Sequence, residues 1–372
     1  MVDNKNLINR RKFLEKTLMS IGGIVLIPAI NLKTIGLDEW PEGEVLGRNT
    51  VYLPSALPIR SKPTVSGPVV RYLIEDECVV WLREVIGESP AGRASKKWVE
   101  TPEGYVYCPS LQRVANSPNQ PINELPVYGD EIGMWVEVTV PYVNLELANP
   151  PAKAPWLNEA PKNLWRLYFS QVIWVDEIQM ASDGRILYRV NERYGSYGDI
   201  FWADAAAFRI VTEEEIAPIN PEAENKKVVV NVNHQSLSCF EGNNEVYFCR
   251  VSTGRKLDEY GNPVETWATN PGTHWIWRKL VSLHMSGGGT GAGWDTMSIP
   301  WTSLFVGEGI AIHATFWHND FGTPKSHGCV NTLPEDAKWI FRWTTPHVPY
   351  NIGDVTNNTY EGTRVEVVEP LY

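Results

Sequence analysis

Residues 311–331 read AIHATFWHNDFGTPKSHGCVN, and this stretch decides the interpretation of the whole chain. It places Cys329 two residues after His327, with Gly328 between them, and a further histidine, His313, sixteen residues upstream. Only the thiolate attacks carbonyl carbon well, so we expect a nearby imidazole to hold this sulfur ionised. Gly328 leaves the backbone amides of residues 328 and 329 open to a developing oxyanion. The pattern therefore predicts a cysteine nucleophile, a base and an oxyanion hole.

Two plainer interpretations of this cysteine compete with that prediction. A single cysteine in a β-rich chain is commonly a small buried hydrophobe or half of a disulfide. His327 and Cys329 could also bind zinc together with His318, but a tetrahedral site needs four ligands, and the chain has no C-x-x-C or H-x-x-x-H pair. We therefore expect no metal and no organic cofactor, because thiolate, imidazole and amide donors suffice for acyl transfer.

The segment Ser326–Asn331, SHGCVN, resembles the signature of the L,D-transpeptidase (YkuD-type) catalytic domain. The resemblance begins near Lys227, where KVVVNVNHQSL is similar to the opening strand of the family, and continues through VSTG at 251–254 to the region of Trp343. It implies a β-sandwich catalytic domain over residues 225–346, with a short helix after the cysteine. Within that helix, Thr332 and Glu335 have the spacing of a capping box, which would place Cys329 just before a helix N-terminus that favours thiolate.

The resemblance also implies a role for each residue around the thiol. Cys329 would be the nucleophile and His313 the general base, with the imidazole oriented only by the carbonyl of Ala314, since alanine has no polar side chain. His327 would support the thiolate and the oxyanion. The amides of Gly328 and Cys329 would form the oxyanion hole.

The substrate is likewise what the resemblance implies. Such an enzyme attacks the tetrapeptide stem of peptidoglycan, forms a thioester and passes the acyl group to an amine of another stem peptide. Ser326 and Asn331 would orient the site or the substrate, and Asn331 stands where many members carry arginine, so we expect the substrate carboxylate to be met differently. Two alternatives stay open: a carboxypeptidase or endopeptidase that resolves the thioester with water, and a wall-binding protein without catalysis. We expect Cys329→Ala to abolish turnover and His318→Ala to leave most of it.

Composition indicates a β-rich protein of several domains that does not bind nucleic acid. The 372 residues exceed one ordinary domain, 43% of them are hydrophobic, and 16 Trp with 15 Tyr suit half-buried sheet faces. The net charge of −11 excludes a basic surface for phosphate backbones. We therefore predict a mainly β chain in which small β-barrel modules precede the catalytic domain.

Short apolar runs between turn residues mark the modules in front of the catalytic domain. After a linker at 31–50, residues 51–116 resemble a bacterial SH3-like domain, a module that binds a partner or serves as a spacer, and residues 127–216 predict a second β-module. A faint repeat relates GYVYC at 104–108 to GDIFW at 198–202. Residues 347–372 would form a C-terminal segment that closes with a strand.

The N-terminus resembles a twin-arginine export signal over residues 1–30. RRKFL at 10–14 precedes a mildly apolar run at 17–30, which is the arrangement of a basic region followed by a short hydrophobic region. The alternative is a basic, amphipathic first helix of a cytosolic domain. The run is shorter than the about 20 apolar residues of a transmembrane helix, so we expect an exported protein with membrane association only through an uncleaved signal.

The chain contains an odd number of cysteines. Five are present, which in an oxidising compartment allows two disulfides and one free thiol. Cys78 with Cys108 and Cys239 with Cys249 are the candidate pairs, and scattered buried thiols are the alternative. Sequence alone does not separate these possibilities, because spacing does not establish distance.

Overall fold

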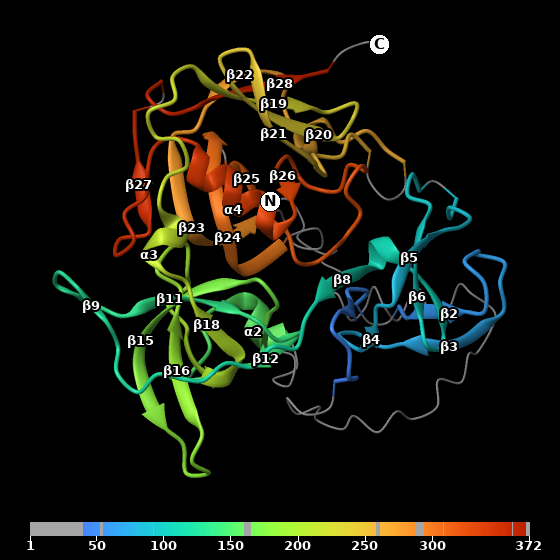
Figure 1. Cartoon of the computed structure of the whole chain (residues 1–372), viewed down its shortest axis with the longest axis horizontal. Coiled ribbons are helices and arrows are strands. Elements are labelled where there is room, and N and C mark those ends of the chain that lie inside the picture. The colour runs from blue at the N-terminus through green and yellow to red at the C-terminus, as the bar shows by residue number, and fades with distance from the viewer. Residues whose placement is uncertain are drawn as a thin grey trace, which may run out of the picture.

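The computed structural model describes residues 40–52, 55–91, 93–159, 165–257, 261–287, 294–307, 309–358 and 360–369. The predicted export signal at 1–30 lies outside these residues, as do residues 31–39 of the predicted linker, whereas residues 46–49 of that linker form a strand of the first module. Within the described part, no helix has both the length and the apolar character needed to cross a membrane. The prediction of a mainly β chain is confirmed, because strands dominate all three parts of the molecule (Figure 1).

The first module carries eight short strands. They are β1 (Leu46–Asn49), β2 (Leu57–Arg60), β3 (Val69–Leu73), β4 (Cys78–Val80), β5 (Arg83–Ile86), β6 (Lys97–Thr101), β7 (Gly104–Tyr107) and β8 (Leu111–Val114), with the 3-10 helix η2 (Cys108–Ser110) before β8. One antiparallel sheet has the order β4-β1-β8 and the other β3-β2-β7-β6-β5. Fully buried Ile59, Val99, Val106 and Leu111 fill the space between the two sheets.

The second module packs beside the first. Its strands are β9 (Val127–Tyr128), β10 (Glu131–Ile132), β11 (Met134–Val138), β12 (Tyr142–Asn144), β13 (Glu146–Leu147), β14 (Arg166–Tyr168), β15 (Val172–Met180), β16 (Ile186–Asn191), β17 (Ile200–Asp204) and β18 (Phe208–Ile210), with helices α2 (Pro155–Glu159) and η4 (Ala205–Ala207). The main sheet has the order β13-β17-β16-β15-β11-β18. Its core also takes in Leu46, Cys78 and Val114 of the first module, so the two modules share buried apolar surface.

The repeat seen in the sequence corresponds to a shared structural unit. In the first module β7, η2 and β8 follow one another directly, and in the second module β17, η4 and β18 do the same. In each module the strand after the 3-10 helix pairs antiparallel with the first long strand, β8 with β1 and β18 with β11. The kinship of both modules with SH3-like domains stays a prediction.

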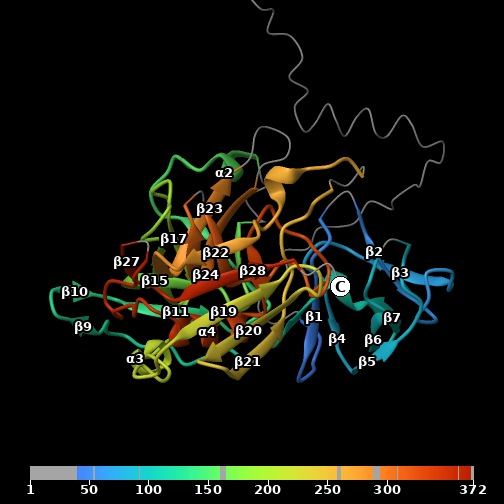
Figure 2. The ribbon, with the colours of Figure 1, turned by 90° about the horizontal axis from the view of Figure 1, so that it is seen from above.

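The third part is a sandwich of two five-stranded sheets. It contains β19 (Lys226–Asn231), β20 (Ser236–Glu241), β21 (Asn244–Arg250), β22 (Gly272–Trp275), β23 (Arg278–Gly287), β24 (Trp294–Val306), β25 (Ile310–Ala314), β26 (Val330–Thr332), β27 (Asp354–Thr356) and β28 (Arg364–Val368), with α3 (Glu213–Ile216) leading in, η5 (Glu265–Trp267) and α4 (Pro334–Trp343). The sheet orders are β21-β20-β19-β28-β22 and β26-β25-β24-β23-β27. Residues 347–372, predicted as a C-terminal segment, thus supply one strand to each sheet (Figure 2).

Alternating apolar residues build the core of this sandwich. In β19, Val228 and Val230 are fully buried while their neighbours are partly exposed, as expected for a strand with one covered face. Val365 and Val367 of β28 lie beside them, because these two strands pair in parallel. Helix α4 adds Ile340 to the same cluster, so the predicted short helix after the cysteine packs against the sheets.

The start of that helix differs from the prediction. Leu333 is the N-cap and Pro334 the first helical residue, and no side chain caps the helix. Thr332 instead belongs to β26 and donates its hydroxyl to the carbonyl of His313 at 3.2 Å. Proline suits the first helical position because it has no N–H to satisfy there. The predicted capping box is therefore wrong, and strand β26 lies between Cys329 and the helix in sequence.

All five cysteines are unpaired thiols in this structure. Cys239 lies opposite Tyr247 and Cys249 opposite Leu237, so the two sulfurs occupy a diagonal of the ladder, where Cα atoms are about 7–8 Å apart. That separation exceeds the reach of a disulfide. Cys78 and Cys108 belong to different hydrophobic clusters, on either side of the first module. The alternative of scattered buried thiols therefore describes these four residues.

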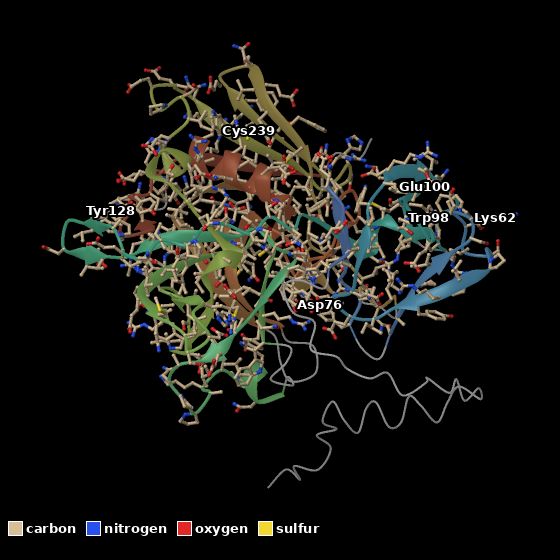
Figure 3. All side chains as sticks on the ribbon, turned by 60° about the horizontal axis from the view of Figure 1, so that its bottom comes forward. Lys62, Asp76, Trp98, Glu100, Tyr128 and Cys239 are labelled. Atoms are coloured by element: carbon tan, nitrogen blue, oxygen red, sulfur yellow. The ribbon has the colours of Figure 1, made fainter. Side chains whose placement is uncertain are left out.

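The side chains in Figure 3 show how the parts meet. Trp98 and Glu100 lie within the first module, whereas Asp76 lies on its side toward the rest of the molecule. A third cluster joins the second module to the sandwich, in which Trp135 and Trp174 pack with Trp301 and Phe341. The sandwich that carries the catalytic candidates thus packs on the second module through buried aromatic side chains.

Candidate active site

Cys329 immediately precedes β26, beside the strand that carries His313. Strands β25 and β26 run in parallel with Ile312 opposite Val330 and His313 opposite Asn331. Paired residues of parallel strands point to the same face of a sheet, and successive residues alternate between faces. His313 and Asn331 therefore share one face of the sheet.

The thiol lies on that same face. Ile312 and Val330 point into the core between the two sheets. Ala311, which alternates with Ile312 as His313 does, packs on the opposite side in a cluster that Cys329 joins. The sulfur is 3.7 Å from the carbonyl oxygen of Gly309, and Cys329 is half-buried. The structure therefore brings the predicted nucleophile and the predicted base to one face of two neighbouring strands.

The tautomer of His313 follows from its hydrogen bond. Its Nδ1 is 2.9 Å from the carbonyl oxygen of Ala314, and a carbonyl can only accept, so Nδ1 carries the proton. In the neutral ring Nε2 is then the unprotonated nitrogen and can accept a proton. The Ala314 carbonyl holds the ring in the orientation that a base requires.

Burial favours the neutral form of both groups. It raises the pKa of the Cys329 thiol to about 11, against a hydrogen bond from the backbone of Ala311 that lowers it. It lowers the pKa of His313 to about 4, although the bond to Ala314 works in the other direction. Low-dielectric surroundings disfavour the charged form of each group. Burial therefore favours a neutral thiol and a neutral imidazole, whereas the sequence predicts an ionised sulfur.

The turn before the thiol is closed by Ser326. Its hydroxyl donates to the carbonyl of Cys329 at 2.5 Å and accepts the amide of Gly328 at 3.1 Å. Gly328 has a φ of +121°, and a side chain there would meet Ile310 at 3.1 Å, so glycine is required by both backbone and space. The amide of Gly328, predicted as an oxyanion donor, is therefore already engaged by Ser326 in this structure.

A neighbouring loop supports the turn from the other sheet. The hydroxyl of Thr269 accepts the amide of Gly254 at 2.9 Å and donates to the carbonyl of Gly328 at 2.7 Å. Ser252 exchanges two backbone hydrogen bonds with Asn331, each 2.9 Å long. The sequence alone assigns no role to Thr269. The VSTG motif at 251–254 is the sequence feature that points toward it, because Gly254 at the end of this motif bonds to Thr269, which in turn bonds to the turn of the cysteine.

His327 lies near Trp267 and Arg255, to which the sequence alone assigns no role. Its ring meets the indole of Trp267 edge to face, with centroids 4.3 Å apart. The guanidinium of Arg255 lies 4.8 Å from the centre of the Trp267 ring, and its Nε is buried without a partner among the described residues. Burial and the Arg255 charge lower the pKa of His327. Arg255 thus places a positive charge beside the turn that carries the thiol.

The prediction that His318 is dispensable assumes that this residue lies apart from the site. In the structure it lies next to Asn331. It is buried, and burial with the charge of Lys325 lowers its pKa to about 3, so the ring is neutral. The amide of Asp320 donates to Nδ1 at 3.1 Å, which leaves the proton on Nε2. Nε2 is 3.1 Å from the side-chain amide of Asn331.

The hydrogen bond between these two residues determines how the amide of Asn331 is turned. With Nδ2 toward His318, two donors would face each other and the buried Oδ1 would have no partner among the described residues. Turning the amide by 180° lets Oδ1 accept from Nε2, and the orientation of an amide is assigned from its partners. Nδ2 is then a buried donor on the face that carries His313. No three His, Cys, Asp or Glu side chains gather as metal ligands in the described ranges.

Residues 225–367 match the L,D-transpeptidase catalytic domain family (YkuD). No curated protein sequence matches the chain significantly. Among solved structures, a point mutant of the Enterococcus faecium L,D-transpeptidase is 19% identical with a TM-score of 0.30, over 40% of this chain and 51% of that one. An L,D-transpeptidase from Mycobacterium smegmatis is 13% identical with a TM-score of 0.30, over 60% and 99%. L,D-transpeptidase 3 from Mycobacterium tuberculosis is 13% identical with a TM-score of 0.30, over 54% and 92%. This chain therefore spans about half of the Enterococcus faecium protein.

Proposed function

We propose, from the match of residues 225–367 to the L,D-transpeptidase catalytic domain, that this protein is a peptidoglycan L,D-transpeptidase acting outside the cytoplasm. The observation that supports it most directly is the shared sheet face of Cys329 and His313, with the Nδ1 of His313 held by the Ala314 carbonyl. This arrangement suits acyl transfer by a thiol, since a positioned imidazole can accept the thiol proton.

The reaction proceeds through a thioester. As Sγ of Cys329 attacks the carbonyl carbon of the third stem residue, Nε2 of His313 takes the thiol proton, so the thiolate exists only as the bond forms. The tetrahedral intermediate then collapses, and the terminal D-residue leaves as an amine that receives this proton. An amine of a second stem peptide attacks the thioester, gives its proton to His313, and the released sulfur recovers it.

Backbone amides next to the thiol stabilise the oxyanion in this proposal. The amide of Cys329 is the first donor, and the amide of Gly328 contributes once its 3.1 Å bond to Ser326 opens. Arg255 supplies the positive charge for the stem carboxylate, a task that Asn331 cannot perform because it is uncharged. Once the amide of Asn331 is turned so that Oδ1 accepts from His318, Nδ2 takes the position of Oδ1, which is buried and unpartnered among the described residues, and can donate to a substrate carbonyl.

The decisive experiment offers the purified protein a tetrapeptide muropeptide with and without a second stem as amine acceptor. Mass spectrometry is expected to show a cross-linked dimer whose mass is the sum of the two less the released D-residue. Release of a tripeptide alone would instead establish a hydrolase, and binding without any product would establish a wall-binding protein. The same assay with a donor amidated at its terminal carboxylate tests Arg255, since the neutral donor should be used less well.

The neutral resting pair predicts different pH profiles for turnover and for alkylation. Iodoacetamide reacts with thiolate, so modification of Cys329 should speed up by about tenfold per pH unit from 7 toward 10, as the thiol approaches its pKa of about 11. Turnover needs a neutral His313, so kcat/KM should fall only as the pH drops toward the imidazole pKa of about 4 and should be flat above it.

Alkylation measured by intact mass from pH 6 to pH 10 checks this profile, with the Cys329→Ala protein as the blank. An alkylation rate that does not change across neutral pH would mean a preformed ion pair. That result would contradict the neutral pair while leaving cysteine acyl transfer possible.

A further inference from the structure

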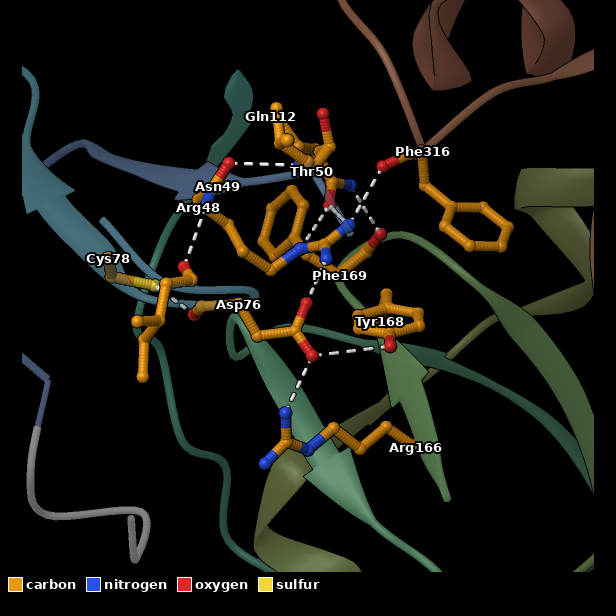
Figure 4. Close-up of polar contacts among 12 residues, drawn as sticks. Arg48, Asn49, Thr50, Asp76, Cys78, Gln112, Arg166, Tyr168, Phe169 and Phe316 are labelled. Atoms are coloured by element: carbon orange, nitrogen blue, oxygen red, sulfur yellow. Dashed lines mark hydrogen bonds and ion pairs between the residues drawn. The ribbon is translucent and has the colours of Figure 1, made fainter. Parts of the chain in front are cut away.

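A buried arginine of the first module reaches the loop that connects the base to the nucleophile. Arg48 on β1 is 1% exposed. Its NH1 donates to Asp76 at 2.5 Å, and its Nε and NH2 donate to the side-chain oxygen of Gln112 at 2.9 and 2.8 Å (Figure 4). NH2 also donates to the carbonyl of Phe316 at 2.9 Å, across 268 residues of sequence. Phe316 is the third residue after His313.

The same cluster ties the second module in. Asp76 is 2% exposed and pairs with Arg166 at 2.6 Å through its other oxygen, which the hydroxyl of Tyr168 approaches to 3.3 Å. The Arg48 guanidinium lies 4.0 Å from the centre of the Tyr168 ring, and that ring stacks on Phe316 with centroids 5.8 Å apart. One charged centre therefore joins all three parts of the chain (Figure 4).

Other contacts from the first module lie farther along the loop. The amide of Asn319 donates to the carbonyl of Pro109 at 3.1 Å, and its side chain donates to the sulfur of Cys108 at 3.3 Å. Arg93 forms an ion pair with Asp320 at 3.4 Å. The loop from 315 to 325 is thus held at residues 316, 319 and 320 by a module that carries no part of the predicted chemistry.

The position of this loop governs groups next to the reacting atoms. It carries His318, which bonds to Asn331, and Asn331 lies opposite His313 in the sheet. Trp317 packs near the ring of His313, with centroids 5.8 Å apart. A shift of the carbonyl of Phe316 would therefore move the surroundings of the base. Displacements of about 1 Å in a site can cost about a hundredfold in rate.

We propose that Arg48 is a positioning residue for the acyl transfer, acting from the first module through the carbonyl of Phe316. The first module is then an integral part of the active site rather than a spacer. Only the planar guanidinium group of arginine can donate to Asp76, Gln112 and Phe316 at once, because its N–H groups point in several fixed directions. The expected change in kcat rests on the proposed function. The expected change in the reactivity of the Cys329 thiol does not.

Arg48→Lys is the sharpest test, since lysine keeps the charge beside Asp76 while a single amine cannot also reach Gln112 and Phe316. We expect kcat to fall by about tenfold or more with KM within about twofold, because orientation rather than substrate binding is lost. Because Trp317 packs near His313 and His313 shares a sheet face with Cys329, displacement of the loop should also change the surroundings of the thiol and shift the pH at which Cys329 is alkylated, and this measurement needs no substrate. Arg166→Lys is the matched control, as it perturbs the other partner of Asp76 with no bond to the loop, and it should resemble the wild type.

Thermal unfolding of both variants separates positioning from a loss of fold. A folded Arg48→Lys protein with wild-type kcat and an unchanged alkylation profile would overturn the proposal, and so would an equal loss in the Arg166→Lys protein. A second variant, Asn319→Ala, removes the loop contact to Cys108 without touching a charge and should lower kcat in the same direction. If the wild type itself makes no product, alkylation still decides the role of Arg48, while the proposed function fails separately.

Discussion

If the proposed function holds, the Cys329→Ala protein is expected to lose turnover by a factor on the order of 10⁶, the loss measured for a covalent acyl-transfer enzyme without its nucleophile. Alanine keeps the half-buried packing against Ala311 but has no sulfur to form the thioester. Product formation from the tetrapeptide donor and stem acceptor measures the loss. Intact mass after rapid quenching adds an independent measurement, because only the wild type should gain the mass of the acyl group.

Cys239→Ala is the matched control for this experiment. Cys239 is fully buried in the sandwich core and its pKa is raised by burial, so it should neither react nor affect the rate. Some loss of stability is expected from the small cavity that alanine leaves. Turnover by the Cys329→Ala protein near the wild-type rate would contradict a mechanism in which Cys329 is the nucleophile. Acylation of a different cysteine would identify that residue as the nucleophile instead.

Replacing His313 with glutamine should lower kcat by about 10²- to 10⁴-fold, the contribution of a positioned general base. Glutamine can still donate an N–H toward the Ala314 carbonyl but cannot take the thiol proton, since an amide is not basic at neutral pH. KM should change little, because the lost interaction concerns the transition state. Steady-state kinetics at pH 7 provides the measurement.

One control and one further histidine variant accompany this experiment. His234 lies on the surface near Asn231, so His234→Gln should behave as the wild type. His318→Ala should now lose activity, in contrast to the expectation from sequence, because it leaves Asn331 without its partner in a buried site. Wild-type kcat in the His313→Gln protein would remove His313 as the base.

Local sequence indicated the chemistry, because acyl transfer by cysteine needs a few residue types at short spacing. Ser326, Gly328 and Cys329 lie within four positions, and their roles in the turn depend on backbone bonds between near neighbours. The requirement for glycine at 328 is likewise local, since it comes from a φ of +121°. Alternating valines in β19 indicated a strand with one buried face for the same reason.

Long-range contacts could not be predicted in this way. The charge state of the thiol depends on how much protein surrounds it, and the capping box failed because Thr332 entered a strand instead of a helix. Thr269 and Arg255 meet the turn of the cysteine from segments distant in sequence, so local sequence did not indicate them as site residues. Burial and loop contact are properties of the assembled sheets, and a motif does not encode them.

The sequence alone indicates the SHGC turn, a candidate base upstream of it and β-strands around both. Folding adds the burial that raises the pKa of Cys329 and lowers that of His313, and the hydrogen bond from an arginine 268 residues away in sequence to the loop between them. The physical reason is that desolvation and buried hydrogen bonds arise between segments brought together by folding, whereas residue identity and backbone preference act over a few neighbouring positions.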